Sequence, residues 1–136
     1  MRKELEEKLA KRFPKWFSVN GDARHALTPF GFQCGDGWFN ILWRLGVDME
    51  PLVAELEKET GERFEVVQVK EKVGTLRFYV SHHSDPIDER IMEAQKESSR
   101  TCEVCGQPGN QRETGGGVRA VCDTHVHGLE ELHQIH

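Results

Sequence analysis

Two short pairs of metal-ligand residues constrain this chain more than any other feature. Cys102 and Cys105 are separated by two residues, and Cys122 and His125 repeat that spacing sixteen residues further on. Each pair places two ligand atoms on one tight turn, so two facing turns complete a tetrahedral shell of nitrogen and sulfur. The spacing therefore predicts a metal site made by these four side chains, with Zn²⁺ as the cofactor.

The residues around the two pairs predict a small treble-clef-like module. Glycines at 106 and 109 let the chain leave the first turn, and Gly115, Gly116 and Gly117 let a short hairpin reverse, since glycine accepts positive φ. The residues after Cys122, from 123 to 136, read as a short helix. A zinc knuckle, a hairpin and a helix that supplies the second ligand pair together describe a treble clef.

Other readings of these side chains are weaker. Buried or disulfide-bonded cysteines have no reason to cluster as two such pairs, and disulfides need an oxidising compartment. His127 is an alternative fourth ligand, but His125 repeats the first spacing and lies one helical turn from Cys122. His133 and His136 have no cysteine or carboxylate placed to complete a second shell, so we expect them to be solvated.

Length and composition restrict the fold class and the cellular location that we expect. The chain has 136 residues, of which 37% are hydrophobic and 30% are charged, as in a globular protein of ordinary size. We expect an α+β fold, with a helical and β-hairpin body over residues 1–99 and a zinc module over 100–136 packed on it. The sequence has no run of about 20 apolar residues and no apolar signal core, which favours a cytoplasmic location without membrane contact. Reducing conditions there keep thiols free as ligands.

The apolar periodicity predicts four helices and two strands in the body. A helix should stop before Pro14, and Asp36 should be the N-cap of a helix that buries Trp38. Pro51 fits the first turn of a helix, so we expect a break near residues 46–48 and a new helix that closes at Gly61. The predicted ranges are helices at 2–13, 36–45, 49–60 and 86–99, and strands at 64–69 and 75–80 joined by a short turn.

The remaining candidate sites are a cysteine, a histidine pair and a group of aromatic residues. Cys34 is a lone thiol between glycines and aromatics; it needs His25, His82 or His83 nearby to act as a nucleophile, and we expect a buried structural role instead. His82 and His83 point to opposite faces if they continue a strand, so we expect a solvated strand end. Core packing accounts for several aromatics, and others on loops can anchor a partner.

Three segments carry a resemblance to a known group of proteins. CGDGW at residues 34–38, VKEKVGTLRFYV at 69–80 and TCEVCGQPG to VCDTH at 101–125 resemble small proteins of bacteriophages and prophages. The resemblance covers roughly residues 30–125. It implies a phage or prophage origin and zinc binding, and it implies no particular reaction.

The charge distribution separates three classes of function. The formal net charge is −5, and residues 100–136 contain three arginines against five acids, whereas nucleic-acid binders gather cations. We therefore expect a non-enzymatic zinc protein with a protein partner, which would contact the aromatics between Trp16 and Trp38 and the hairpin tip at Gly115 to Arg119. A nucleic-acid-binding zinc finger is the first alternative. An HNH-type nuclease is the second, although residues 106–121 offer only Glu113 as an acid.

Overall fold

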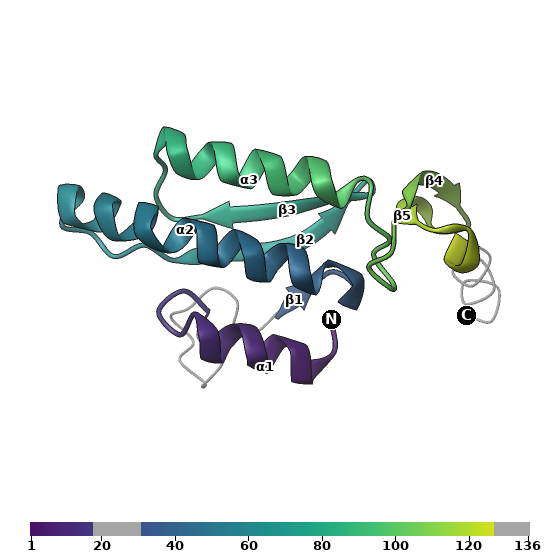
Figure 1. The fold of residues 1–136 in the computed structure, drawn as a ribbon, viewed down its shortest axis with the longest axis horizontal. Coiled ribbons are helices and arrows are strands. Elements are labelled where there is room, and N and C mark those ends of the chain that lie inside the picture. The colour runs from purple at the N-terminus through teal and green to yellow at the C-terminus, as the bar shows by residue number, and fades with distance from the viewer. Residues whose placement is uncertain (18–30, 127–136) are drawn as a thin grey trace.

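Over the part of the chain that the structure describes, the fold comprises three main helices, a three-stranded sheet and a separate two-stranded hairpin (Figure 1). The computed structural model describes residues 1–17 and 31–126, and the predicted α+β class is confirmed. In chain order the elements are α1 (Lys3–Arg12), β1 (Phe32–Gln33), the 3₁₀ helix η1 (Asp36–Trp38), α2 (Phe39–Thr60), β2 (Val66–Lys72), β3 (Thr75–Val80), α3 (Asp85–Ser98), β4 (Asn110–Thr114) and β5 (Gly117–Val121). One helical turn follows at residues 123–126.

The larger sheet has the strand order β1-β2-β3. β1 runs parallel to β2, and α2 makes the long connection that a parallel pair requires. β2 and β3 form the predicted antiparallel hairpin, whose two-residue turn has positive φ at Val73 (52°) and Gly74 (74°). α2 and α3 lie over one face of this sheet (Figure 1).

The hydrophobic core lies between that face and the helices. Strand register aligns Phe32, Val69 and Phe78 across the three strands, and all three side chains are buried. α2 contributes Leu42, Met49 and Val53, and α3 contributes Ile87. α3 begins as its sequence predicts, because the Ser84 hydroxyl caps the N–H of Ile87 and Pro86 occupies the first turn.

The predicted break at residues 46–48 is wrong, because α2 is one helix of 22 residues that contains Pro51. Proline removes one helical hydrogen bond and costs about 3 kcal/mol inside a helix. The helix buries Leu45 and Met49 before the proline and Val53 and Leu56 after it, and each such side chain contributes about 1.5–3 kcal/mol. Burial on both sides therefore outweighs the proline. The helix ends at Gly61 with φ 71°, as predicted.

Gly46, which the prediction placed in the break, has a different role. It is buried, and a Cβ atom at this position would lie 2.4 Å from Cζ of Phe13. The missing side chain lets the residues after α1 approach α2 closely. Glycine here marks a packing contact and not a helix end.

The predicted N-cap at Asp36 is also wrong. Its carboxylate caps no backbone N–H of the helix that follows. It instead accepts a hydrogen bond from the backbone N–H of Arg2 at 2.7 Å and pairs with the Arg2 guanidinium at 2.8 Å. The residue therefore ties the N-terminus to η1.

The described aromatic residues between Trp16 and Trp38 are core residues, so the prediction that they form a partner surface is wrong for them. Trp16 is 6% exposed and Trp38 is 0% exposed. Phe17 packs edge-on against Phe32 and Phe78, and Trp16 packs against Phe64. Residues 18–30, which include Phe30 and His25, lie outside the described residues.

None of the helices within residues 1–17 and 31–126 is both apolar and long enough to cross a bilayer.

Candidate metal centre

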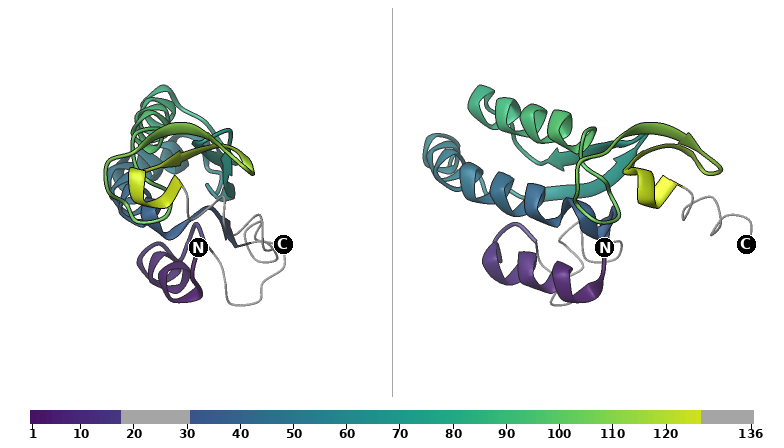
Figure 2. Two further views of the ribbon diagram at one scale, coloured as in Figure 1. Left: turned by 90° about the vertical axis from the view of Figure 1, so that its right-hand side faces the viewer. Right: turned by 45° about the vertical axis from the view of Figure 1, so that its right-hand side comes forward.

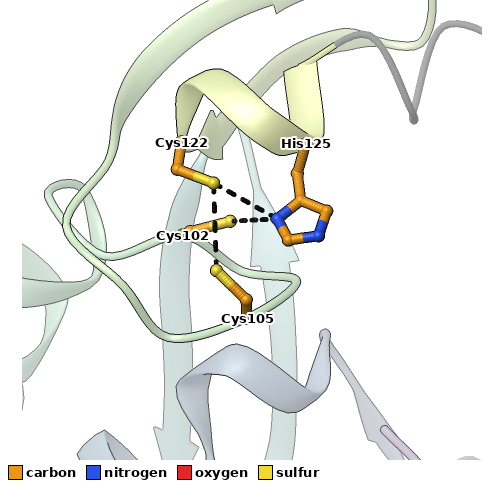
Figure 3. A group of neighbouring side chains, drawn as sticks. All are labelled: Cys102, Cys105, Cys122 and His125. Carbon is orange, nitrogen blue, oxygen red and sulfur yellow. Dashed lines mark hydrogen bonds between the residues drawn. The ribbon is translucent and has the colours of Figure 1, made fainter.

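The structure brings together the four side chains that the spacing singled out (Figure 3). One ligand atom from each of Cys102, Cys105, Cys122 and His125 lies within 4.8 Å of the others. Nδ1 of His125 is 3.2 Å from Sγ of Cys122 and 3.6 Å from Sγ of Cys102, and the sulfurs of Cys105 and Cys122 are 3.8 Å apart. All four cysteines of the chain are free thiols.

These separations fit the edges of a tetrahedral metal site. With metal–sulfur bonds of about 2.3 Å and metal–nitrogen bonds of about 2.0 Å, sulfur–sulfur edges are about 3.8 Å and sulfur–nitrogen edges about 3.5 Å. The observed separations of 3.2 to 3.8 Å match this shell. The cluster therefore forms a potential metal site in which His125 presents its Nδ1 atom.

Local backbone geometry holds each pair. The first pair lies on a tight turn closed by hydrogen bonds from Gly106 N–H to Cys102 O (2.8 Å) and from Cys102 N–H to Gln107 O (2.7 Å), and Gly106 has φ 82°. The second pair lies at the start of the helical turn, where His125 N–H donates to Cys122 O at 3.1 Å. The predicted hairpin, β4 and β5, connects the two pairs.

The surroundings of Cys122 favour its thiolate, the form that binds metals. Partial desolvation raises the pKa of Cys122, but hydrogen bonds from the backbone and side chain of His125 and from the neighbouring thiols lower it to about 6. The pKa of Cys105 is raised instead, because desolvation and the neighbouring thiols outweigh the hydrogen bond that the backbone N–H of Gln107 donates to its sulfur. Such hydrogen bonds orient metal ligands.

Glu103 connects the first ligand pair to the sheet and helices. Its side chain is 4% exposed, and one carboxylate oxygen accepts the N–H of Gly35 at 2.9 Å. Its backbone O accepts the N–H of Gly37 at 2.7 Å, and its own N–H donates to Ala120 O at 2.9 Å. Burial raises the pKa of Glu103, and the Arg119 guanidinium opposes that shift.

Arg119 bridges two acids from different parts of the chain. Its guanidinium lies 3.0 Å from Glu103 and 3.2 Å from Glu71 at the end of β2. We predicted this arginine as part of an exposed hairpin tip, and that placement is wrong because the side chain is 32% exposed and engaged on both sides. It joins β5, the first ligand pair and the β2–β3 hairpin.

Close backbone contacts also join the region around the ligand pairs to η1 and to the β2–β3 turn. A Cβ atom on Gly37 would lie 2.1 Å from Cys102 O, and the indole N–H of Trp38 donates to Thr101 O at 3.0 Å. On the other side, the side-chain amide of Gln111 donates to Val73 O at 3.0 Å. Residues 101–126, which we call the C-terminal module, therefore meet both η1 and the β2–β3 turn (Figure 2).

The other candidate groups do not converge on a catalytic arrangement within the described residues. Cys34 is buried, and desolvation together with the Glu103 charge raises its pKa to about 12. His82 pairs with Glu62, whereas His83 is 63% exposed and pairs with Asp88. The two histidines therefore have separate partners. His127, His133 and His136 lie outside the described residues.

Sequence reasoning missed Glu103 and the bridging role of Arg119. A glutamate between two metal ligands has no pattern that distinguishes it from a solvated one. Its partner Gly35 is 68 residues away in the chain, so only the fold reveals the contact. The two glycines around Asp36 were the one available signal, because close backbone approach requires glycine.

The chain was compared with protein-family models, with curated proteins and with solved structures, and none of the three comparisons gives a match.

Proposed function

We propose that this chain is a non-enzymatic binding protein whose Cys102, Cys105, Cys122 and His125 hold one structural zinc ion. The main observation in support is that three sulfurs and one imidazole nitrogen lie at the separations expected of a tetrahedral shell. Cysteine-rich shells of this kind select Zn²⁺ over hard cations such as Mg²⁺. Bound zinc would join the two turns that carry the ligand pairs.

A structural role is favoured over a hydrolytic one by the ligand count. Catalytic zinc keeps one coordination position open for water, and four protein ligands leave none. Within the described residues, the Cys/His cluster is the one group of three or more potential ligands close enough to hold a metal. The HNH-type alternative needs a histidine base and further ligands in the hairpin, and β4 and β5 contain neither histidine nor aspartate.

We also propose which kind of partner this protein binds and through which surface. The resemblance to phage and prophage proteins favours a host protein or defence complex as the partner. The surface we propose is the outer side of the C-terminal module, where Val104 is 39% exposed beside Cys105 and the hairpin tip at Gly115 to Gly117 is exposed. An exposed apolar residue on a metal-braced turn gives a rigid point of contact.

Metal analysis tests the structural site. Protein purified without added metal should contain close to one zinc per chain by elemental analysis, and Cys105→Ser and His125→Ala should each lose most of it. His82→Ala is the matched control, because that imidazole pairs with Glu62 away from the cluster. Folded wild-type protein from zinc-replete cells with less than about a fifth of an equivalent would refute the proposal.

A pull-down with two matched variants tests the partner proposal. Val104→Glu should lose a co-purifying host protein, whereas Met92→Glu, which alters an exposed apolar residue on α3, should retain it. Both variants should keep their zinc. Equal loss or equal retention of the captured protein in the two variants would show that this surface is not the contact.

A further inference from the structure

The open face of the larger sheet carries cations without acids. Residues paired directly across strands lie on the same face, so the register groups Gln33 with Lys70 and Arg77, Gln68 with Tyr79, and Lys72 with Thr75. The hydrogen bond from Gln68 Nε2 to Gln33 Oε1 at 3.0 Å confirms that these two amides share it. We call Gln33, Gln68, Lys70, Lys72, Arg77 and Tyr79 the cationic sheet face.

This face lies opposite the helices. The buried residues Val69, Leu76 and Phe78 point to the other side, toward α2 and α3. Among the described helices none covers the cationic sheet face, since α1 packs on α2 (Figures 1 and 2). Tyr79 is 44% exposed there, with its ring available for stacking.

Among the described residues, the cations of this face have no ion-pair partners. Lys70, Lys72 and Arg77 make no ion pair within the described residues, and Nε of Arg77 is buried without a hydrogen-bond partner. The one acid in the three strands, Glu71, points to the other face and binds Arg119. Glu65, just before β2, pairs with Arg63. Lys70 and Arg77 are directly opposed, an arrangement that costs stability unless an anion lies between them.

We propose that the cationic sheet face binds single-stranded nucleic acid. Lys70 and Lys72 lie two residues apart on one strand, roughly 7 Å at about 3.4 Å per residue, and Arg77 lies beside Lys70 across the strands. Together they form a short track of positive charge for a sugar–phosphate backbone. Tyr79 supplies a stacking surface for a base, and the two glutamine amides supply donors and acceptors for base edges.

The combination of groups favours a nucleic acid over an acidic protein segment. Carboxylates would satisfy the three cations but give the exposed tyrosine ring and the paired amides no role. The net charge of −5 argued against nucleic acid for the chain as a whole. The cationic sheet face itself carries positive charge, because the excess acids lie elsewhere.

Fluorescence anisotropy with a labelled 12-nucleotide oligothymidylate and its RNA equivalent tests the proposal. Because each neutralised phosphate of a single strand contributes about 0.7, the plot of log affinity against log salt should have a slope of about −2 for three cations. The double variant Lys70→Gln/Arg77→Gln should reduce the slope to about −0.7. Tyr79→Ala should weaken binding about tenfold, and Tyr79→Phe should retain it.

The matched control is Lys58→Gln/Lys96→Gln, which removes the same charge from exposed positions on α2 and α3. It should leave affinity and slope within about twofold of wild type. The proposal is overturned by absence of binding at 50 mM salt, by equal loss in the control, or by equal affinity for duplex DNA. Equal affinity for a polyglutamate peptide that is insensitive to Tyr79→Ala would assign the face to an acidic protein. Zinc content reports separately on the metal proposal.

Discussion

Cys34 and Glu103 are both ionisable and both buried, but their contacts give them different roles. Cys34 is a thiol in an apolar setting, and desolvation makes its ionisation unfavourable. Glu103 is also buried, but its side chain pairs with Arg119 and the residue makes three hydrogen bonds with backbone groups. The first side chain is therefore inert, and the second connects parts of the fold.

Cys34 should not react as a nucleophile in the folded protein. With a pKa of about 12, its thiolate fraction at pH 8 is on the order of 10⁻⁴. Mass spectrometry after iodoacetamide treatment of the zinc-loaded protein should find Cys34 unmodified until denaturant is added, with Cys34→Ser as the control. Because the pKa rises from about 9 in the unfolded chain, the stability that this thiol contributes is present below pH 9 and is lost as pH rises through about 12. Rapid labelling without unfolding would contradict the assignment.

Glu103→Gln should lower the free energy of unfolding by about 1–3 kcal/mol, because it leaves Arg119 facing a neutral amide in a largely buried contact. The lower part of this range is expected, since Arg119 is 32% exposed and water screens the pair. Denaturant unfolding of the zinc-loaded protein gives the measurement. Glu113→Gln, an exposed change on the same hairpin, should alter stability by less than about 0.5 kcal/mol. Equal effects from both variants would contradict the joining role of Glu103.

At the scale of elements, α2 illustrates competition between local and tertiary preferences. Pro51 and Gly46 together predict two helices, and the structure has one. The proline is exposed, and the carbonyl of Val47 that loses its partner lies on the outer side, where Val47 is 39% exposed. Water can satisfy that carbonyl, so the cost stays small enough for packing to outweigh it.

Pro51→Ala should therefore stabilise the protein. Restoring the helical N–H and removing the ring clash should raise the free energy of unfolding by about 1–3 kcal/mol. Thermal and denaturant unfolding measure the change, with Ala54→Ser as an exposed control on the same helix. If α2 were two helices with Pro51 in a first turn, the substitution would leave stability unchanged or lower it.

At the scale of the whole molecule, the Cys/His cluster and the sheet are joined by contacts between residues far apart in sequence. Glu103 and Arg119 link the C-terminal module to Gly35 and Glu71, and Trp38 bonds to Thr101. Loss of metal should therefore affect the sheet end near the β2–β3 turn as well as the module. The core between α2, α3 and the sheet has its own apolar contacts and should persist.

Cys105→Ser should unfold residues from about 100 onward and leave the body folded, because structural zinc contributes on the order of 10 kcal/mol of apparent binding free energy. Limited proteolysis with mass spectrometry should find cleavage within residues 100–126 of the variant and protection of α2 and α3. Chelation of the wild-type metal should give the same pattern, and zinc addition should reverse it. Equal resistance of variant and wild type would mean that zinc does not hold this region.

The sequence by itself determined the features that depend on near neighbours. Ligand spacing identified the four cluster residues, alternation and turn chemistry identified the β2–β3 and β4–β5 hairpins, and Gly61 marked the end of α2. Only the tertiary structure decided the parallel pairing of β1, the continuity of α2, the burial of Trp16 and Trp38, and the bridge through Glu103 and Arg119. These features depend on contacts between residues tens of positions apart. Local propensity does not determine which distant side chain will bury a residue or supply the opposite charge.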